Sequence, residues 1–77
     1  MTRTRDFRVR YHRTHSSAER SLLMRAVKRD GSPVWCVYIG DIQVPAGMDE
    51  DPLVAVGRIV ADVFRECVFT HIEEVTK

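Results

Sequence analysis

The residues best suited to chemistry in this 77-residue chain are its histidines, its two cysteines and a pair of serines. His12 and His15 lie three positions apart, His71 is far along the chain, and Cys36 falls in an apolar segment. A structural zinc site needs four ligands, usually supplied as two close pairs. Because only one close pair is present and a second is missing, the sequence predicts no metal site. The favoured interpretation is that the histidines are surface residues on a basic strand.

A catalytic nucleophile needs a neighbouring base and a group that orients this base. Ser16 and Ser17 directly follow His15, but adjacent residues on a loop do not form a triad. His12 lies among arginines that could stabilise a phosphate transition state, as in an RNA-cleaving site, yet no second acid or base accompanies it. The four glycines are isolated and form no phosphate-binding loop. We therefore expect no enzyme and no cofactor, with a small ribonuclease as the less favoured alternative.

Length and composition restrict what these residues could build. A chain of 77 residues has room for one small core, one sheet and a helix or two, and hardly for a deep active-site cleft. Its composition, 44% hydrophobic and 30% charged, is typical of a globular protein. The apolar runs are too short to span a membrane, and MTRTRDFR lacks the apolar core of a signal peptide. We expect a single domain, residues 1–77, in the cytoplasm of the host cell, with Cys36 and Cys67 as buried, reduced thiols.

The first half of the chain predicts strands. Apolar residues at 7, 9 and 11 alternate with cations at 8, 10 and 12 in FRVRYHR, which is typical of a half-buried strand. RSLLMRAVKR at 20–29 leaves helix and strand open: its residues are good helix formers, and Ser16 with Glu19 has capping-box spacing. Asp30-Gly31 then gives a strong hairpin signal, which favours a strand at 20–29. VWCVYI at 34–39 suits a central strand, and 42–44 a short strand that Pro45 ends.

The second half predicts one amphipathic helix. Three acids at 49–51 precede Pro52, which is a favourable start for a helix. An apolar stripe follows at spacings of three and four: Leu53, Val56, Ile59, Val60, Val63, Phe64 and Cys67. The end of the chain, 68–77, is open to helix or strand. We favour slightly an edge strand in which residues 69, 71, 73 and 75 alternate with their neighbours.

The net charge of +1 hides a division between the two halves. Residues 1–29 hold nine Lys or Arg and two acids, a balance of +7, and residues 30–77 hold three Lys or Arg and nine acids, a balance of −6. Such asymmetry suggests electrostatic recognition of a partner, although the two halves could instead neutralise each other within one fold. As the binding residues we predict the cations along the first strand: Arg3, Arg5, Arg8, Arg10, His12 and Arg13. Their guanidinium groups suit phosphate and carboxylate alike.

Residues 23–64 resemble the fold of HicB-type antitoxins. That pattern has a strand, a turn with Asp-Gly, an apolar and aromatic strand, a short irregular piece and an amphipathic helix opened by Asp and Pro. Here these parts are LMRAVKR, DG, VWCVYIGDI, QVPAGM and DEDPLVAVGRIVADVF. The resemblance covers about half the chain, and it implies an antitoxin-like module. The basic strand at the front departs from it, as does the absence of a following DNA-binding domain.

In length, in the lack of an enzyme motif and in lopsided charge, the chain also resembles the small anti-CRISPR proteins of phages and mobile elements. This likeness of type rests on no residue motif. It implies a protein that binds a CRISPR effector complex and blocks its target DNA. The basic strand would then meet an acidic groove of a subunit or the guide's phosphates. Alternatively, MDEDP and the acidic helix face would mimic DNA.

We therefore predict an α+β fold, in which a small antiparallel sheet of three or four strands has one main amphipathic helix packed on one face. A ferredoxin-like βαββαβ order is the alternative if residues 17–29 are helical. The predicted function is non-catalytic inhibition of a nucleic-acid-handling complex through a protein partner. An antitoxin module and a direct nucleic-acid binder are alternatives. No membrane partner is expected, and the chain could be a monomer or a small homo-oligomer.

Overall fold

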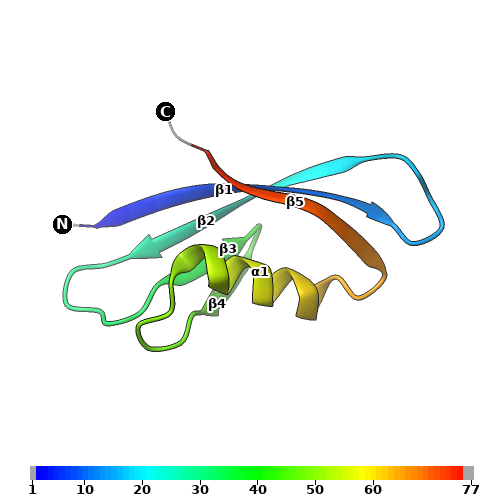
Figure 1. Cartoon of the computed structure of the whole chain (residues 1–77). Coiled ribbons are helices and arrows are strands. Elements are labelled where there is room, and N and C mark those ends of the chain that lie inside the picture. Colours follow the sequence, from blue (N-terminus) through cyan, green and yellow to red (C-terminus); the bar gives the residue numbers. More distant parts are fainter. Residues whose placement is uncertain (1, 76–77) are drawn as a thin grey trace.

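The computed structural model describes residues 2–75 and consists of a five-stranded antiparallel sheet and a helix (Figure 1). The elements in chain order are β1 (Arg3–Arg13), β2 (Arg20–Lys28), β3 (Cys36–Ile39), β4 (Ile42–Pro45), α1 (Pro52–Val63) and β5 (Cys67–Val75). Across the sheet the strands lie in the order β4-β3-β2-β1-β5, so the last strand returns to pair with the first. Figure 1 shows α1 below the sheet.

The predicted fold class is wrong. Strands make up 50% of the structure and the short helix 16%, so the fold is dominated by its sheet rather than by a main helix packed on three or four strands. The fifth strand arises because residues 67–75 pair with β1, and α1 spans only 12 residues. The ferredoxin-like alternative is wrong as well, because residues 20–28 form a strand.

The alternation in FRVRYHR forms the strand that the sequence predicted. Phe7 and Val9 are fully buried, whereas Arg8 and Arg10, which alternate with them, are exposed. The buried residues that pack with Phe7 and Val9 come from β2, β3, α1 and the residue that follows β4. Together they make the core: Phe7, Val9, Met24, Ala26, Val37, Ile39, Ala46, Ala55, Val56, Ile59 and Val60. Trp35 is half-buried and packs against this core.

The other face of the sheet turns away from α1, and no element among residues 2–75 covers it. Side chains opposite each other in neighbouring strands share a face. From the strand registers, the residues on this face are Thr4, Asp6, Arg8, Arg10 and His12 of β1, Ser21, Leu23, Arg25 and Val27 of β2, Cys36 and Tyr38 of β3, Gln43 and Pro45 of β4, and Val68, His71, Glu73 and Val75 of β5. We call this set the open face. It is amphipathic, because Leu23 is 55% exposed among its charges.

Turns join the strands where the sequence predicted them, with one difference in length. Gly31 has a φ of +81°, a left-handed conformation that glycine adopts without strain. The connection around it runs from residue 29 to 35, however, so β2 and β3 are not joined by a two-residue turn. Gly40, with a φ of +58°, lies in the tight turn between β3 and β4, and β4 ends at Pro45 as expected.

The helix begins where the sequence predicted. The Asp51 carboxylate accepts a hydrogen bond of 2.9 Å from the Leu53 N–H, which caps the first turn, and Pro52 follows the cap. The predicted apolar stripe is only partly correct: Val56, Ile59 and Val60 are buried, but Leu53 and Val63 are 42% and 45% exposed. Ala55 is buried although the predicted stripe omitted it, so the buried face of the helix is rotated toward Ala55 relative to the prediction. Among the described residues, no helix has the length and hydrophobicity needed to cross a membrane.

The final segment is an edge strand, as favoured, but its predicted alternation is interrupted. The register passes from Arg10 opposite His71 to Tyr11 opposite Phe69, so Thr70 is an extra residue in a β-bulge. The bulge puts Phe69 with the core-side aromatics, whereas His71 lies on the open face. Residues 76–77 of the predicted segment lie outside the described residues. Both cysteines are free and partly exposed, which corrects the expectation that they are buried.

Candidate polyanion-binding surface

The six predicted binding residues do not form one surface. Because successive side chains in a strand point to opposite faces, β1 divides the predicted strip in two. The even-numbered residues Arg8, Arg10 and His12 lie on the open face, and the odd-numbered residues Arg3, Arg5 and Arg13 lie on the side of α1. A single row of six cations is therefore replaced by two groups with different surroundings.

Arg5 is engaged inside the molecule. Its guanidinium donates two hydrogen bonds to the Glu74 carboxylate, one of them 2.9 Å long from Nε to Oε2. The same group lies 5.4 Å from the centroid of the Phe7 ring and 6.0 Å from that of Trp35. The hydrogen bonds that Arg5 donates to Glu74 raise the pKa of Arg5 and lower that of the carboxyl group. Arg5 thus ties β1 to β5 and is not available as a free docking cation.

Arg8 and Arg10 are the cations that the open face presents to solvent. Within residues 2–75, Arg8 has no acidic oxygen at ion-pair distance. Arg10 is 46% exposed and makes only long contacts, 3.8 Å to Glu73 and 3.9 Å to Glu19. Exposed pairs at such distances contribute little to stability. Both guanidinium groups can therefore reorient toward an incoming anion.

A third arginine, which the sequence analysis missed, joins them. Arg20 begins β2 opposite Tyr11, so the register puts it on the side of α1, but at the very start of the strand it still lines a shallow hollow of about 360 Å³ with Arg8, Arg10, Glu19 and Ser21. We call Arg8, Arg10 and Arg20 the arginine cluster. The signal was present in the sequence, because an antiparallel pairing of 20–28 with the first strand brings residue 20 beside residues 10–12. The uncertainty between helix and strand at 20–29 hid it.

The two oppositely charged halves neutralise each other only in part. Of the nine Lys and Arg residues in 1–29, three have an acidic partner within 4 Å in the described part of the chain: Arg5, Arg10 and Arg25. The Arg25 partner is Asp6, which belongs to the same half. Among residues 2–75, the remaining six have no such partner: Arg3, Arg8, Arg13, Arg20, Lys28 and Arg29. Most of the positive charge of the β1–β2 hairpin is therefore left for solvent or a partner.

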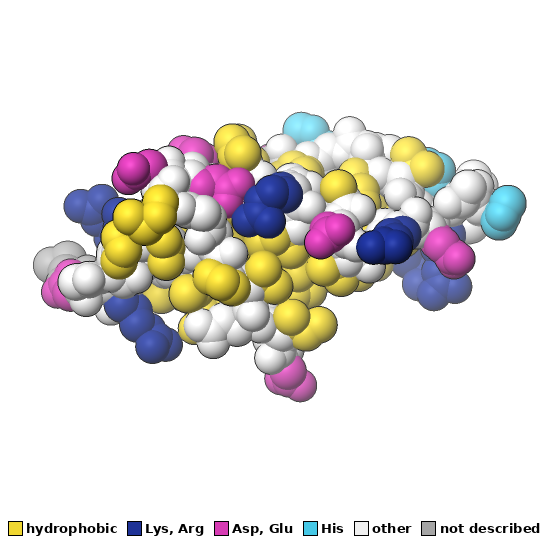
Figure 2. Space-filling model, turned by 90° about the horizontal axis from the view of Figure 1, so that it is seen from below, with side chains coloured by type: hydrophobic (Ala, Val, Ile, Leu, Met, Phe, Trp, Pro, Cys, Tyr) yellow, Lys and Arg dark blue, Asp and Glu magenta, His cyan; other side chains and the backbone are white. Residues whose placement is uncertain are grey.

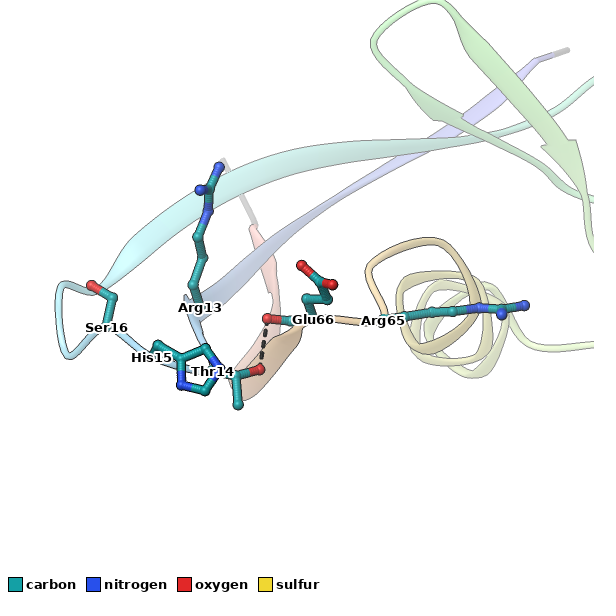
Figure 3. Close-up of a pocket in the computed structure, with 6 residues that line it drawn as sticks. All are labelled: Arg13, Thr14, His15, Ser16, Arg65 and Glu66. Carbon is teal, nitrogen blue, oxygen red and sulfur yellow. Dashed lines mark hydrogen bonds between the residues drawn. The ribbon is translucent and has the colours of Figure 1, made fainter.

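A second hollow, of about 570 Å³, lies where the β1–β2 loop meets the turn before β5 (Figure 3). Thr14 joins the two segments, because its N–H and its hydroxyl both donate to the Glu66 carbonyl oxygen, at 3.0 and 2.8 Å. Figure 3 shows the Arg13 and Arg65 side chains pointing in different directions, so they do not converge on one ligand. This hollow is a structural junction in the described chain.

The geometry brings no catalytic constellation together in the part of the chain that is described. Ser16 accepts a hydrogen bond from the Ala18 N–H, and no histidine hydrogen-bonds to it within residues 2–75. The His12 Nδ1 donates to the Arg13 carbonyl oxygen over 2.9 Å, which holds the ring against its own strand. No group of three His, Cys, Asp or Glu among the described residues could hold a metal ion.

Comparison with known proteins finds no family model that matches the chain, and no curated protein or solved structure matches it either. The resemblances to HicB-type antitoxins and to anti-CRISPR proteins therefore stay predictions.

Proposed function

We propose that this chain is a non-catalytic binding protein that docks on a nucleic-acid-handling complex, such as a CRISPR effector complex, in the host cytoplasm and blocks access of target DNA. The observation that supports this proposal is the incomplete neutralisation of the β1–β2 hairpin. Six cations of this hairpin have no acidic partner among residues 2–75, and two of them, Arg8 and Arg20, share a hollow with Arg10.

The arginine cluster would recognise an anion that presents two neighbouring oxygen atoms to a guanidinium group. A guanidinium group offers parallel N–H donors that match a carboxylate or a phosphate. Ser21 adds a hydroxyl at the same hollow, and Glu19 on its rim would release Arg10 on binding. A DNA-handling complex presents such anions in its acidic grooves and along its guide. A small protein held there would occupy the path of the target.

The test is whether the chain inhibits the binding of target DNA to reconstituted CRISPR effector complexes, as measured by electrophoretic mobility shift. We expect the wild-type chain to reduce DNA binding and Arg8→Ala/Arg10→Ala to lose at least tenfold in potency, as for two charge-assisted contacts, roughly. The matched control is Arg58→Ala/Arg65→Ala, which removes two positive charges outside the β1–β2 hairpin and should inhibit normally. Equal inhibition by both double variants, or none by the wild type, contradicts the proposal.

Direct binding of nucleic acid is the second candidate, and the same unpaired cations favour it. Free DNA or RNA would then bind without any protein complex, and the slope of log K against log salt would be roughly −0.9 for each phosphate contact. Affinity for isolated nucleic acid that falls in Arg8→Ala/Arg10→Ala would favour this candidate over the inhibitor. The antitoxin and ribonuclease alternatives stay predictions; the latter requires RNA cleavage that His12→Ala abolishes.

A further inference from the structure

β5 is a long strand with an unpaired outer edge. It spans nine residues, pairs with β1 on one side and ends the sheet on the other. Apart from this ladder, its backbone within residues 2–75 makes one backbone hydrogen bond, between the Cys67 N–H and the Phe64 carbonyl oxygen. The opposite edge, β4, has only four residues and includes Pro45, which blunts it. The free N–H and C=O groups of β5 are therefore the natural place for strand addition.

An exposed apolar flank of α1 lies beside this edge. A side chain at Gly57 would contact the Ile72 side chain at 3.9 Å, so this flank of the helix faces β5. Residues 53, 54 and 61 share the flank by helical period. Leu53 and Val54 are 42% and 61% exposed, so this flank offers adjacent apolar side chains that a partner at the β5 edge would cover. Figure 2, which views the molecule from the side of α1, shows hydrophobic side chains exposed on this side of the molecule.

We propose that a second copy of this chain pairs with β5, antiparallel and about a two-fold axis near Ile72, to form one continuous ten-stranded sheet. Antiparallel pairing of identical edges closes on itself and leaves no free β5 edge. It also places both helices on the same side of the joined sheet. Their flanks, with Leu53 and Val54, then lie next to the axis and to each other.

The charges of β5 select this register. The bulge at Thr70 limits regular pairing to the residues after it. An axis at Glu73 or Glu74 would set identical carboxylates directly opposite each other, which is unfavourable. An axis at Ile72 instead places His71 of one copy opposite Glu73 of the other, on the open face, in both halves of the dimer. His71 Nε2 and Glu73 Oε2 already lie 3.5 Å apart within one copy, so a second copy repeats an existing contact between these two side chains.

The first test is the mass of the purified chain by sedimentation and light scattering over a dilution series. We expect twice the 8.9 kDa of the chain at high concentration, and dissociation on dilution. Val54→Glu should make the protein monomeric, because it introduces like charges across the axis at a side chain exposed enough to leave folding intact. Ile42→Glu on the β4 edge and Leu23→Glu on the open face are similarly exposed controls and should stay dimeric.

The second test fixes the register by cross-linking. In a background with Cys36→Ser and Cys67→Ser, Ile72→Cys should form an intermolecular disulfide on mild oxidation, because residues opposite each other at the axis lie within disulfide distance. Val75→Cys should not, since its two copies would be roughly 20 Å apart along the strands. A chain that is monomeric throughout, a dimer that Ile42→Glu or Leu23→Glu breaks, or cross-linking at 75 in preference to 72 overturns the proposal.

Discussion

Arg5 and Arg8 stand three positions apart on one strand, yet their guanidinium groups have opposite roles. The period of a strand predicts that they face different sides, and the structure confirms this. The period of the strand does not predict which residues from other strands lie beside each arginine. Glu74 reaches Arg5 only because β5 returns beside β1, 69 residues along the chain. A cationic residue in sequence is therefore a candidate for binding until the long-range pairing of its strand is known.

The Glu74 carboxylate should make stability depend on pH in a defined direction. The hydrogen bonds from Arg5 lower its pKa from the ordinary 4.5, so the pair stabilises the fold above that value and is lost as the pH falls through the lowered pKa. We expect Glu74→Gln to reduce the melting temperature by a few degrees at neutral pH, roughly, and the difference from wild type to shrink as the pH falls through the lowered pKa. Thermal unfolding followed by circular dichroism measures this. Glu66→Gln, at a carboxylate without an ion pair in residues 2–75, should change little; an equal effect of both would contradict the assignment.

At the scale of elements, Gly57 tests how closely α1 packs on its neighbours. A glycine inside a helix costs about 1 kcal/mol relative to alanine. A Cβ at this position would lie 3.9 Å from the Ile72 Cδ1, which is ordinary van der Waals contact. Gly57→Ala should therefore stabilise the protein by about 0.5–1 kcal/mol, as judged by chemical denaturation. Destabilisation would mean that the helix approaches β5 more closely than the structure shows.

The sequence predicted most elements but not their assembly. Alternation identified β1, the Asp-Gly turn decided for β2, and the acids before Pro52 placed the start of α1. These signals depend on residues that are close together in the sequence, so they can be interpreted without knowing the fold. The bulge at Thr70 and the pairing of β5 with β1 depend on contacts between the two ends of the chain, so neither could be predicted. The same limit hid Arg20, whose place in the arginine cluster depends on strand pairing rather than on spacing.

In the whole molecule, the pairing of two β5 edges would increase the affinity with which the open face binds an anionic partner. β1 is the neighbour of β5, so each arginine cluster lies one strand away from the proposed axis. Both copies would present their open faces on the same side, and two clusters would meet one extended anionic partner. A two-site contact gains affinity without any new type of interaction. Loss of inhibition in Val54→Glu, far from the cluster, would then arise through the dimer.

The division of charge between the two halves predicts how salt acts on the protein itself. If the halves were held together by mutual attraction, screening would weaken the fold markedly. The ion pairs that join them, Arg5 with Glu74 and Asp51 and Arg10 with Glu73, are few and partly exposed, and most hairpin cations have no acidic partner in residues 2–75. We therefore expect the free energy of unfolding to change by less than about 1 kcal/mol between low and high salt. Denaturation curves in both conditions measure this free energy of unfolding.

Binding to an anionic partner, in contrast, should fall steeply over the same range of salt, because screening acts on the cations that the fold leaves unpaired. A large loss of stability together with salt-independent binding would show that the halves exist to hold each other.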